Sequence, residues 1–477
     1  MAAASTAYLA PGLLARTQAT LPPLADWKKA AEIRDRISLP RFPARDFLVT
    51  EFGAVGDGKT VNTSFIREAI TACNGAGGGR VVIPPGDFLT GPVHLASNVN
   101  LHVAEGATLL FSKNPGDYLP LVQTWFEGVE LMNYSPFIYA FGAENVALTG
   151  GGILDGQADF DDWWSWRGPR AWKGMKSGSG TGWKEGMPYQ KASRGVLMEM
   201  AAKGVPVQQR KFGEGHYLRS AMVEFNRCTR VFIEGVTLQR APFWSVHPVL
   251  STNVTARGLK IENPVGANAD GIDPECCSGV LIEHCTFDTG DDCISLKSGR
   301  DHDGRRLNTP CRDVVIAGCH FSSERSALSC GSESSGGIRN IYIENVTAGT
   351  VFRFFRIKTN TQRGGVNENI HIRHARIEKA LENFVEIQTN FNEPLKDLPG
   401  VTDVQKHIPV IQNISLADID CGPAGRALNL PGTSDTPIRN LELRRIKIGP
   451  VANDNILTYL ENPISEDVII GGEEFTF

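Results

Sequence analysis

NIYIEN at residues 340–345 recurs as NIHIRH at 369–374, NISLAD at 413–418 and NLELRR at 440–445. Each copy joins a polar residue to a short run in which apolar side chains alternate with others, as in a half-buried β-strand. Weaker copies precede them, namely NVALTG at 145–150, RVFIEG at 230–235, NVTARG at 253–258, GVLIEH at 279–284 and DVVIAG at 313–318. From residue 253 to 440 the copies lie mostly about 25–35 residues apart, with one interval near 44.

A repeat of this length, built from strands without intervening helices, is typical of a solenoid. Strands alternating with helices would instead indicate a βαβ sheet, but no amphipathic helix of useful length is predicted after residue 80. We therefore predict an all-β protein with the architecture of a right-handed parallel β-helix. The asparagine that opens many copies supports this fold, because Asn tolerates turn conformations and its amide can bond to the neighbouring coil.

One domain, residues 46–477, is predicted to hold these coils. A helix over 63–73, capped by Asn62 or Thr63, is expected to cover the open N-terminal edge of the solenoid. Residues 1–45 are predicted to be an export signal or a flexible lead-in with a possible short helix. The first 19 of them are rich in Ala and Leu, like the apolar part of a signal peptide, but lack its basic start.

Three stretches interrupt the repeat and are predicted to be loops. Residues 156–215 contain five tryptophans and are expected to form a long insertion over one flank, where the rings either stack on sugars or pack a core. DHDGRR at 301–306 is predicted to lie at the rim of a groove, as a solvated turn or a substrate contact. Residues 390–407 account for the one long interval.

Composition excludes several classes of protein. The content of 41% hydrophobic and 21% charged residues is ordinary for a globular protein, and a net charge of −5 offers no attraction to nucleic acid or to an anionic membrane surface. No apolar run reaches the length of a membrane-spanning helix. The ten cysteines form no CxxC pair and are predicted to be buried hydrophobic residues, with one or two disulfides possible if the protein is exported.

Carboxylates gather in two neighbouring copies of the repeat. Asp270 lies in NADGID at 268–273, and Asp291 and Asp292 follow in DTGDDCISLK at 288–297, about one coil later. Because adjacent coils are separated by about 4.8 Å, these side chains are predicted to share one face. An isolated Asp-Asp pair is usually a solvated turn. The inference therefore depends on Asp270, Asp291 and Asp292 occupying the same position in successive copies of the repeat. Paired acids in this arrangement suit cleavage of a glycosidic bond.

Basic residues follow in the same phase on the next coils. Arg325 is reached one period after the aspartates, and Arg356 and Lys358 one period later. Arg-Ile-Lys alone would indicate an exposed strand. Placed above a row of acids, the same cations can bind the carboxylate of an acidic sugar.

These motifs resemble those of family 28 glycoside hydrolases, the polygalacturonase family of pectin degradation. The resemblance rests on NADGIDP at 268–274, DTGDDCISLKSG at 288–299, CGSESSGGIRN at 330–340 and RIKT at 356–359. It extends to GAVGDG at 53–58 and GPVHLASNV at 91–99, while FGEGHYLR at 212–219 and PFWSVHP at 242–248 suit the bacterial branch. In all it covers roughly residues 48–450.

The resemblance implies inverting hydrolysis in a parallel β-helix, with no metal and no cofactor. By position, Asp291 is the general acid, and Asp270 and Asp292 hold and deprotonate the attacking water. Arg356 and Lys358 are implied to bind the uronate carboxylate. Inversion generally places the two carboxyl groups about 6.5–9.5 Å apart, a separation that these acids on adjacent coils could meet. Crowding is expected to raise the pKa of at least one of them.

One position departs from the family pattern. A histidine usually stands in a Gly-His-Gly before Gly-Ser-Glu, and here the aligned residue is Arg325. Its permanent charge would either depress the pKa of nearby aspartates or bind a second anionic group on the substrate. His247 is expected to line the groove and bind substrate, although a structural role suits it equally.

We therefore expect a monomeric, secreted or periplasmic hydrolase that removes α-linked galacturonic acid from pectin or pectic oligosaccharides. Exo-action is favoured because the insertion at 156–215 could close one end of the groove. One alternative is a hydrolase of rhamnogalacturonan-type oligosaccharides. Others are a calcium-dependent lyase on the same scaffold and a non-catalytic carbohydrate-binding β-helix. Neither nucleic acid nor membrane is an expected partner.

Overall fold

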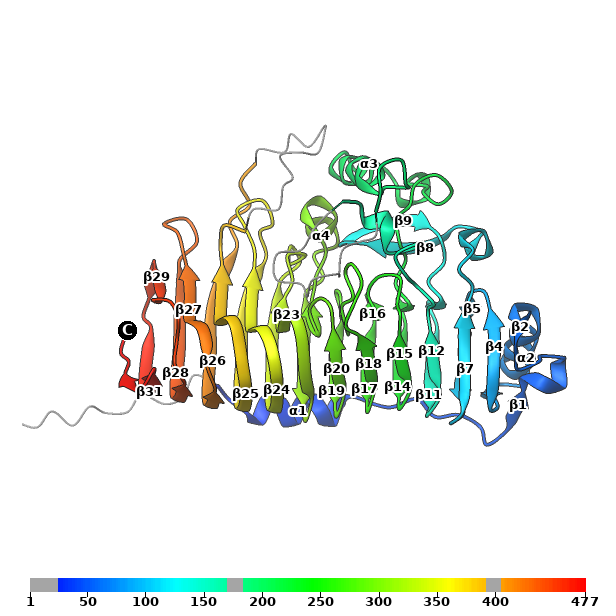
Figure 1. Ribbon diagram of the computed structural model, residues 1–477, viewed down its shortest axis with the longest axis horizontal. Helices are drawn as coiled ribbons and strands as arrows, with labels where there is room; N and C mark the ends of the chain where they lie inside the picture. The colour runs from blue at the N-terminus through cyan, green and yellow to red at the C-terminus, as the bar shows by residue number, and fades with distance from the viewer. Residues whose placement is uncertain (1–24, 170–182, 392–404) are drawn as a thin grey trace, which may run out of the picture.

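The computed structural model describes residues 25–169, 183–391 and 405–477, and the export signal predicted near the N-terminus lies outside them. These residues form a right-handed parallel β-helix whose coils stack along the long axis of the molecule, from the blue N-terminal end to the red C-terminal end (Figure 1). The predicted fold class is confirmed. Parallel strands in register build three faces.

The first face runs the whole length of the molecule. Its strands, in the order of their pairing, are β1 (Asp46–Leu48), β3 (Gly79–Ile83), β6 (Val99–Val103), β11 (Glu144–Gly150), β14 (Thr229–Glu234), β17 (Thr252–Arg257), β19 (Ser278–Glu283), β22 (Cys311–Ala317), β24 (Ile338–Lys358), β25 (Val366–Gln388), β26 (Val410–Cys421), β28 (Ile438–Ile448) and β31 (Ile464–Ile470). The recurring sequence motifs all lie on this face.

Two further faces complete each coil. The second contains β2 (Asp57–Val61), β4 (Gly86–Thr90), β7 (Ala107–Phe111), β12 (Ile153–Asp155), β15 (Thr237–Gln239), β18 (Lys260–Asn263), β20 (Thr286–Thr289) and β23 (His320–Cys330). The third contains β5 (Val93–His94), β10 (Ile138–Phe141), β13 (Val223–Asn226), β16 (Val246–Val249), β21 (Ile294–Leu296), the ends of β23, β24 and β25, β27 (Ala424–Pro431) and β29 (Ile456–Thr458). Single bridges from Val246 to Ile272 and from Ile272 to Ile294 join β16 to β21.

The predicted asparagine ladder is present at the corner that precedes the first face. The amide Nδ2 of Asn369 donates to Oδ1 of Asn340 at 3.1 Å, Asn413 donates to Asn369 at 3.1 Å, and Asn440 donates to Asn413 at 2.9 Å. All four residues have φ between 53° and 57°. Asn is among the few residues with a side chain that adopt this left-handed conformation readily, so one residue makes the turn and bonds the coils together.

Two of the helices agree with the sequence-based expectations. The expected N-terminal helix is α2 (Thr63–Gly75), which covers the end of the solenoid and buries Ile66 and Ile70 in the main core (Figure 1). Asn62 precedes α2 but does not cap it with its side chain; its amide instead bonds to the backbone of Val55, Thr60 and Leu89. The lead-in is not a loose segment, since α1 (Lys28–Arg36) packs Ala30 and Ile33 against the first face.

The other two helices contradict the sequence analysis, which predicted loops at both places. The insertion contains α3 (Lys191–Ala202), which buries Leu197 and Met198, and α4 (Asp301–Leu307) occupies the expected rim loop. Gly195 in α3, and Asp, His and Gly in the short α4, weaken the helical pattern of the sequence. Both helices have tertiary contacts, since α3 packs Leu197 in a core cluster and Asp303 of α4 pairs with Arg210. The remaining elements are the antiparallel hairpin β8 (Val122–Phe126) and β9 (Val129–Asn133), β30 (Leu460–Glu461), β32 (Glu473–Glu474), and the short helices η1 (Val49–Phe52), η2 (Pro115–Tyr118), η3 (Ser165–Arg167) and η4 (Val207–Gln209).

The core is a continuous apolar column inside the coils. It includes Trp163, Trp164 and Trp166 of the insertion, so packing rather than sugar stacking explains these three rings. All ten cysteines are buried and unpaired, as predicted for small hydrophobic residues. Among the helices of the described residues, none is long and apolar enough to cross a membrane.

Candidate active site

The structure brings together the three carboxylates that the sequence analysis grouped. Asp270 lies in the segment that enters the third face, and Asp291 and Asp292 lie one coil later, directly before β21. The amide of Gly271 donates to the carbonyl of Asp292 at 3.0 Å, which holds the two coils in register. One oxygen of each carboxylate lies within 4.8 Å of the other two. Asp270 and Asp292 are buried, and Asp291 is partly exposed.

The three carboxylates form one crowded group, with one oxygen of each within 4.8 Å of the chosen oxygens of the other two. Stacking contributes to this crowding, because side chains at one register position of adjacent coils are held about 4.8 Å apart. The separation of about 6.5–9.5 Å that is common in inverting glycosidases refers to whole carboxyl groups, and for these acids it stays a prediction.

Positive charges lie on the C-terminal side of this group. Lys358, at the end of β24, places its Nζ 3.0 Å from Oδ2 of Asp292. Arg356 reaches the same face, but Nε contacts Glu386 at 2.5 Å and Nη2 donates to Gln388 at 2.9 Å. Both cations are therefore near the acids, and both already have an acidic partner on the protein.

Burial and charge separate the pKa values of the two adjacent aspartates. Burial raises the pKa of Asp291, and the negative charge of Asp292 adds to this effect. Burial would raise the pKa of Asp292 as well, but the charges of Lys358 and Arg356 hold it below its usual range. Asp270 has a pKa raised well above the ordinary value, first by burial and then by repulsion from Asp273. Proton affinity is thus higher at Asp291 than at its neighbour Asp292.

His247 is buried and does not lie at the surface, where the sequence analysis expected it to line a groove. The ring is fully buried, with Nε2 3.0 Å from Glu275 and Nδ1 3.8 Å from Glu224. Burial would lower the pKa of His247, but the two carboxylates raise it to about 9. In this structure the ring has no exposed surface to offer a sugar, and its polar contacts are to Glu275 and Glu224.

Sequence reasoning assigned no role to Lys297, although it lies within the quoted motif. Its Nζ is buried 3.3 Å from Glu333, 3.6 Å from Asp273 and 4.2 Å from the ring centre of Trp244. Burial opposes its charge, but Glu333 and Asp273 raise the pKa of Lys297 well above the ordinary value. Burial raises the pKa of Asp273 to about 7, although the charge of Lys297 opposes this.

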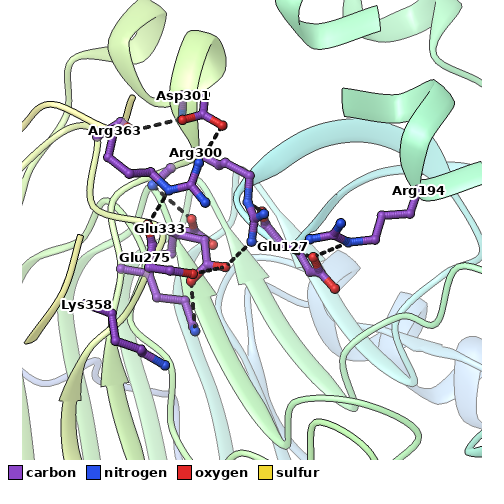
Figure 2. Close-up of polar contacts among 12 residues, drawn as sticks. Glu127, Arg194, Glu275, Arg300, Asp301, Glu333, Lys358 and Arg363 are labelled. Atoms are coloured by element: carbon purple, nitrogen blue, oxygen red, sulfur yellow. Dashed lines mark hydrogen bonds and ion pairs between the residues drawn. The ribbon is translucent and has the colours of Figure 1, made fainter. Parts of the chain in front are cut away.

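A chain of alternating charges continues from Glu333 away from the aspartates (Figure 2). Arg300 donates to Glu333 at 2.6 Å and to the carbonyl of Glu127 at 2.8 Å, and Arg194 of α3 lies 2.6 Å from the Glu127 carboxylate. Lys358 lies on the opposite side of Glu333 from Arg194 in this view (Figure 2). The β8–β9 hairpin is thereby bonded to the coils that carry the aspartates, and α3 of the insertion is bonded to the hairpin.

A second buried pair reinforces this end of the groove. Arg210, just after η4, places Nη1 2.5 Å and Nη2 3.1 Å from the fully buried carboxylate of Asp303 on α4. Asp303 also accepts the backbone amide of Glu130 in β9 at 3.1 Å. We refer to α3, α4 and the β8–β9 hairpin as the end wall, which stands together above β16 and β23 (Figure 1).

Comparison with known proteins places the chain in a family. Residues 211–464 match the model of the glycosyl hydrolases family 28. A probable polygalacturonase of Vitis vinifera is 28% identical over 418 residues, which are 84% of this chain and 73% of that protein. An exo-poly-alpha-D-galacturonosidase of Dickeya chrysanthemi is 25% identical over 389 residues, which are 78% of this chain and 62% of that protein.

A solved structure extends the likeness to nearly the whole chain. The crystal structure of a hyperthermoactive exopolygalacturonase from Thermotoga maritima superimposes with a TM-score of 0.86 at 39% identity, covering 94% of this chain and 96% of that one. The clustered aspartates of the third face lie inside the matched region. The protein is therefore a glycoside hydrolase that belongs to the glycosyl hydrolases family 28.

Proposed function

We propose that this hydrolase removes galacturonic acid, one α-linked unit at a time, from the end of pectic poly- or oligosaccharides. The observation that carries the proposal is the cluster of Asp270, Asp291 and Asp292, in which the adjacent Asp291 and Asp292 have pKa values shifted in opposite directions. Such a pair supplies an acid and a base at one point of the groove. The Thermotoga and Dickeya relatives, described as exo-acting on polygalacturonate, support the choice of substrate.

In the proposed mechanism Asp291 donates its proton to the glycosidic oxygen as the bond to the anomeric carbon breaks. Asp292, with Asp270 beside it, orients a water on the opposite face and accepts its proton. The water attacks from the side away from the leaving sugar, so the configuration inverts and an α-linked substrate gives a β-anomer. Arg356 and Lys358 hold the uronate carboxylate that marks the substrate.

Exo-action follows from the end wall. A groove open at both ends accepts the middle of a polymer, whereas a wall at one end admits only a chain terminus. Here the wall is anchored by the buried Arg300–Glu333 and Arg210–Asp303 pairs, whose separation would leave charges without partners in the interior. We therefore expect it to remain closed rather than to move aside for a polymer.

Product analysis tests this function directly. We expect polygalacturonate digests to contain monogalacturonate as the main early product, with slow loss of viscosity, and proton NMR to show the β-anomer first. Early release of larger oligomers would indicate endo-action. Release only from rhamnogalacturonan fragments would assign the alternative substrate, and a chelator-sensitive, ultraviolet-absorbing product would indicate a lyase.

The pH dependence should report the charge pair of Lys358 and Asp292. Because Lys358 lowers the pKa of Asp292, the base stays ionised into acid solution, and activity is lost only as pH falls through that low pKa. Lys358→Met should raise the pKa of Asp292 and move the acidic limb of kcat/KM to higher pH. Lys358→Arg keeps the charge and serves as the control. An acidic limb that does not move in Lys358→Met would mean that another group controls it.

We further propose that the protein acts as a monomer outside the cytoplasm, either secreted or in the periplasm. Support comes from the substrate, since chains of anionic sugars do not cross a lipid bilayer unaided. Fractionation of the producing cells, with activity measured in each compartment, tests the location, and light scattering tests the oligomeric state.

A further inference from the structure

A hollow of about 420 Å³ lies on the first face, near the N-terminal end of the solenoid. It is lined by side chains of β3, β6, β11 and β14, and by Pro40 and Phe42 of the segment that joins α1 to β1. Figure 1 shows this segment running along the outside of the coils, on the side of the molecule opposite the end wall. The hollow shares no lining residue with the aspartate cluster.

The register of the strands explains why there is space at this place. Arg80 of β3, Asn100 of β6, Ala147 of β11 and Phe232 of β14 are successive partners on adjacent coils. Side chains at one register position of a parallel sheet point the same way, so the methyl group of Ala147 stands in a row between two larger side chains. The row is therefore lowest at β11, and the segment that carries Phe42 leaves part of this space open.

The polar side chains of the hollow orient one another. The hydroxyl of Thr149 donates to Oδ1 of Asn100 at 2.8 Å, so its oxygen accepts the proton on Nδ1 of His102 at 3.0 Å. Burial lowers the pKa of His102, and the charge of Arg80 adds to this effect, so the ring is neutral at pH 7. Nε2 of His102 is then an acceptor. Among the described residues, neither Nε2 nor the amide nitrogen of Asn100 has a hydrogen-bond partner.

Two phenylalanine rings supply the apolar part of the hollow. Phe42 and Phe232 both line it, and both are partly exposed to solvent. Aromatic rings beside a few fixed hydrogen-bonding groups are typical of sites for small amphipathic ligands. A sugar is such a ligand, because the C–H groups on one side of its ring pack on an aromatic surface while its hydroxyls bond to polar side chains.

The two charged residues that line the hollow each have an opposite charge nearby. Arg80 donates to both carboxylate oxygens of Asp46, at 2.9 and 2.6 Å, and Glu234 lies 3.7 Å from Arg257. The carboxylate of an acidic sugar would find Arg80 already paired and would be repelled by Glu234. The arrangement of charge therefore favours a neutral ligand.

We propose that this hollow is a second, non-catalytic site that binds a neutral pyranose sugar. The sugar ring packs on the phenylalanine rings, one of its hydroxyls donates to Nε2 of His102, and a second oxygen accepts the side-chain amide of Asn100. The inference goes beyond the proposed function, because the site takes part in no bond cleavage. A polymer that carries both acidic and neutral sugars is then held at two points of the protein.

The experiment titrates the protein with galactobiose and with cellobiose, two neutral disaccharides, in the presence of saturating trigalacturonate and the Asp291→Asn substitution, which keeps the active site filled. Binding is followed by saturation-transfer NMR and by the Nε2 signal of isotope-labelled His102, which is assigned by its loss in His102→Leu. We expect at least one of the two disaccharides to bind and to shift this signal.

His102→Leu and Phe232→Ala should each weaken that binding by about threefold to tenfold, the range of one hydrogen bond or one aromatic contact. Tyr459→Ala removes an exposed ring at the C-terminal end of the solenoid and serves as the matched control, with unchanged affinity. In the background with an intact Asp291, all three variants should hydrolyse trigalacturonate within about twofold of the wild-type rate. Thermal melts show that each variant is folded.

Three results would overturn the inference. They are no binding of either disaccharide at tens of millimolar, binding that neither His102→Leu nor Phe232→Ala weakens, and a shift of the His102 signal by digalacturonate in preference to the neutral sugars. None of them bears on the proposed function, which is judged separately by the hydrolysis of trigalacturonate in the protein with Asp291 intact.

Discussion

Asp291→Asn should lower kcat on polygalacturonate by about 10²- to 10⁴-fold, the usual contribution of a general acid. The amide cannot donate an acidic proton to the glycosidic oxygen. The substitution preserves shape, and Oδ1 remains able to accept the backbone amide of Asp292, now at 3.1 Å. The backbone carbonyl that Thr289 and Ser323 bond to is also unaffected. The loss should therefore appear in kcat with an unchanged unfolding midpoint.

Asp288→Asn is the matched control for this prediction. Asp288 lies three residues earlier, on β20, and its side chain is exposed on the second face. Its substitution removes the same charge from the same region without touching the third face, so rates should stay within about twofold of wild type. Near-normal kcat in Asp291→Asn would show that the proton comes from another group.

Lys297→Met should destabilise the protein by about 3–5 kcal/mol, the cost of removing one partner from a buried ion pair. Methionine fills much of the same space, so the loss is mainly electrostatic. The substitution removes one of the cations that balance the buried negative charge of Glu333, and it removes the cation paired with Asp273. Neither carboxylate oxygen of Asp273 has a hydrogen-bond partner among the described residues. Urea unfolding followed by circular dichroism gives the free energy of unfolding.

Two further variants sharpen this test. Lys260→Met removes an exposed lysine paired with Glu262 on the second face and should cost less than about 1 kcal/mol. Adding Asp273→Asn to Lys297→Met should recover part of the stability, because the two charges interact directly and their effects are not additive. A Lys297→Met protein as stable as Lys260→Met would mean that the buried network contributes little.

The coils and the aspartate cluster could be predicted because both depend on a single periodicity. A strand pattern repeated every coil fixes which residues stack, so the phase of Asp270, Asp291 and Asp292 was readable from spacing alone. The Asn ladder was equally local, since one residue type at one corner satisfies both the turn and the inter-coil bond.

The insertion was expected to close one end of a groove, but the helices and ion pairs of the end wall could not be predicted, because they depend on residues with no periodic relation. Glu127 meets Arg300 across 173 residues, and Arg210 meets Asp303 across 93. Each of these residues alone resembles a solvated surface charge, and only the folded chain shows that Arg194 of α3 and Asp303 of α4 are paired. His247 could not be placed for a different reason, since spacing predicts its register partner Glu224 but not that its ring is buried between Glu224 and Glu275.

The asparagine ladder has a consequence for how such a protein can diversify. Asn340 and Asn369 are 29 residues apart, and Asn369 and Asn413 are 44 apart. Even so, the side-chain hydrogen bond from Nδ2 to Oδ1 measures 3.1 Å in both pairs. The corner thus keeps the same geometry however long the chain between two corners becomes. Segments on the opposite side can lengthen, shorten or be exchanged without moving the catalytic residues, so new substrates can be accommodated by changing loops alone.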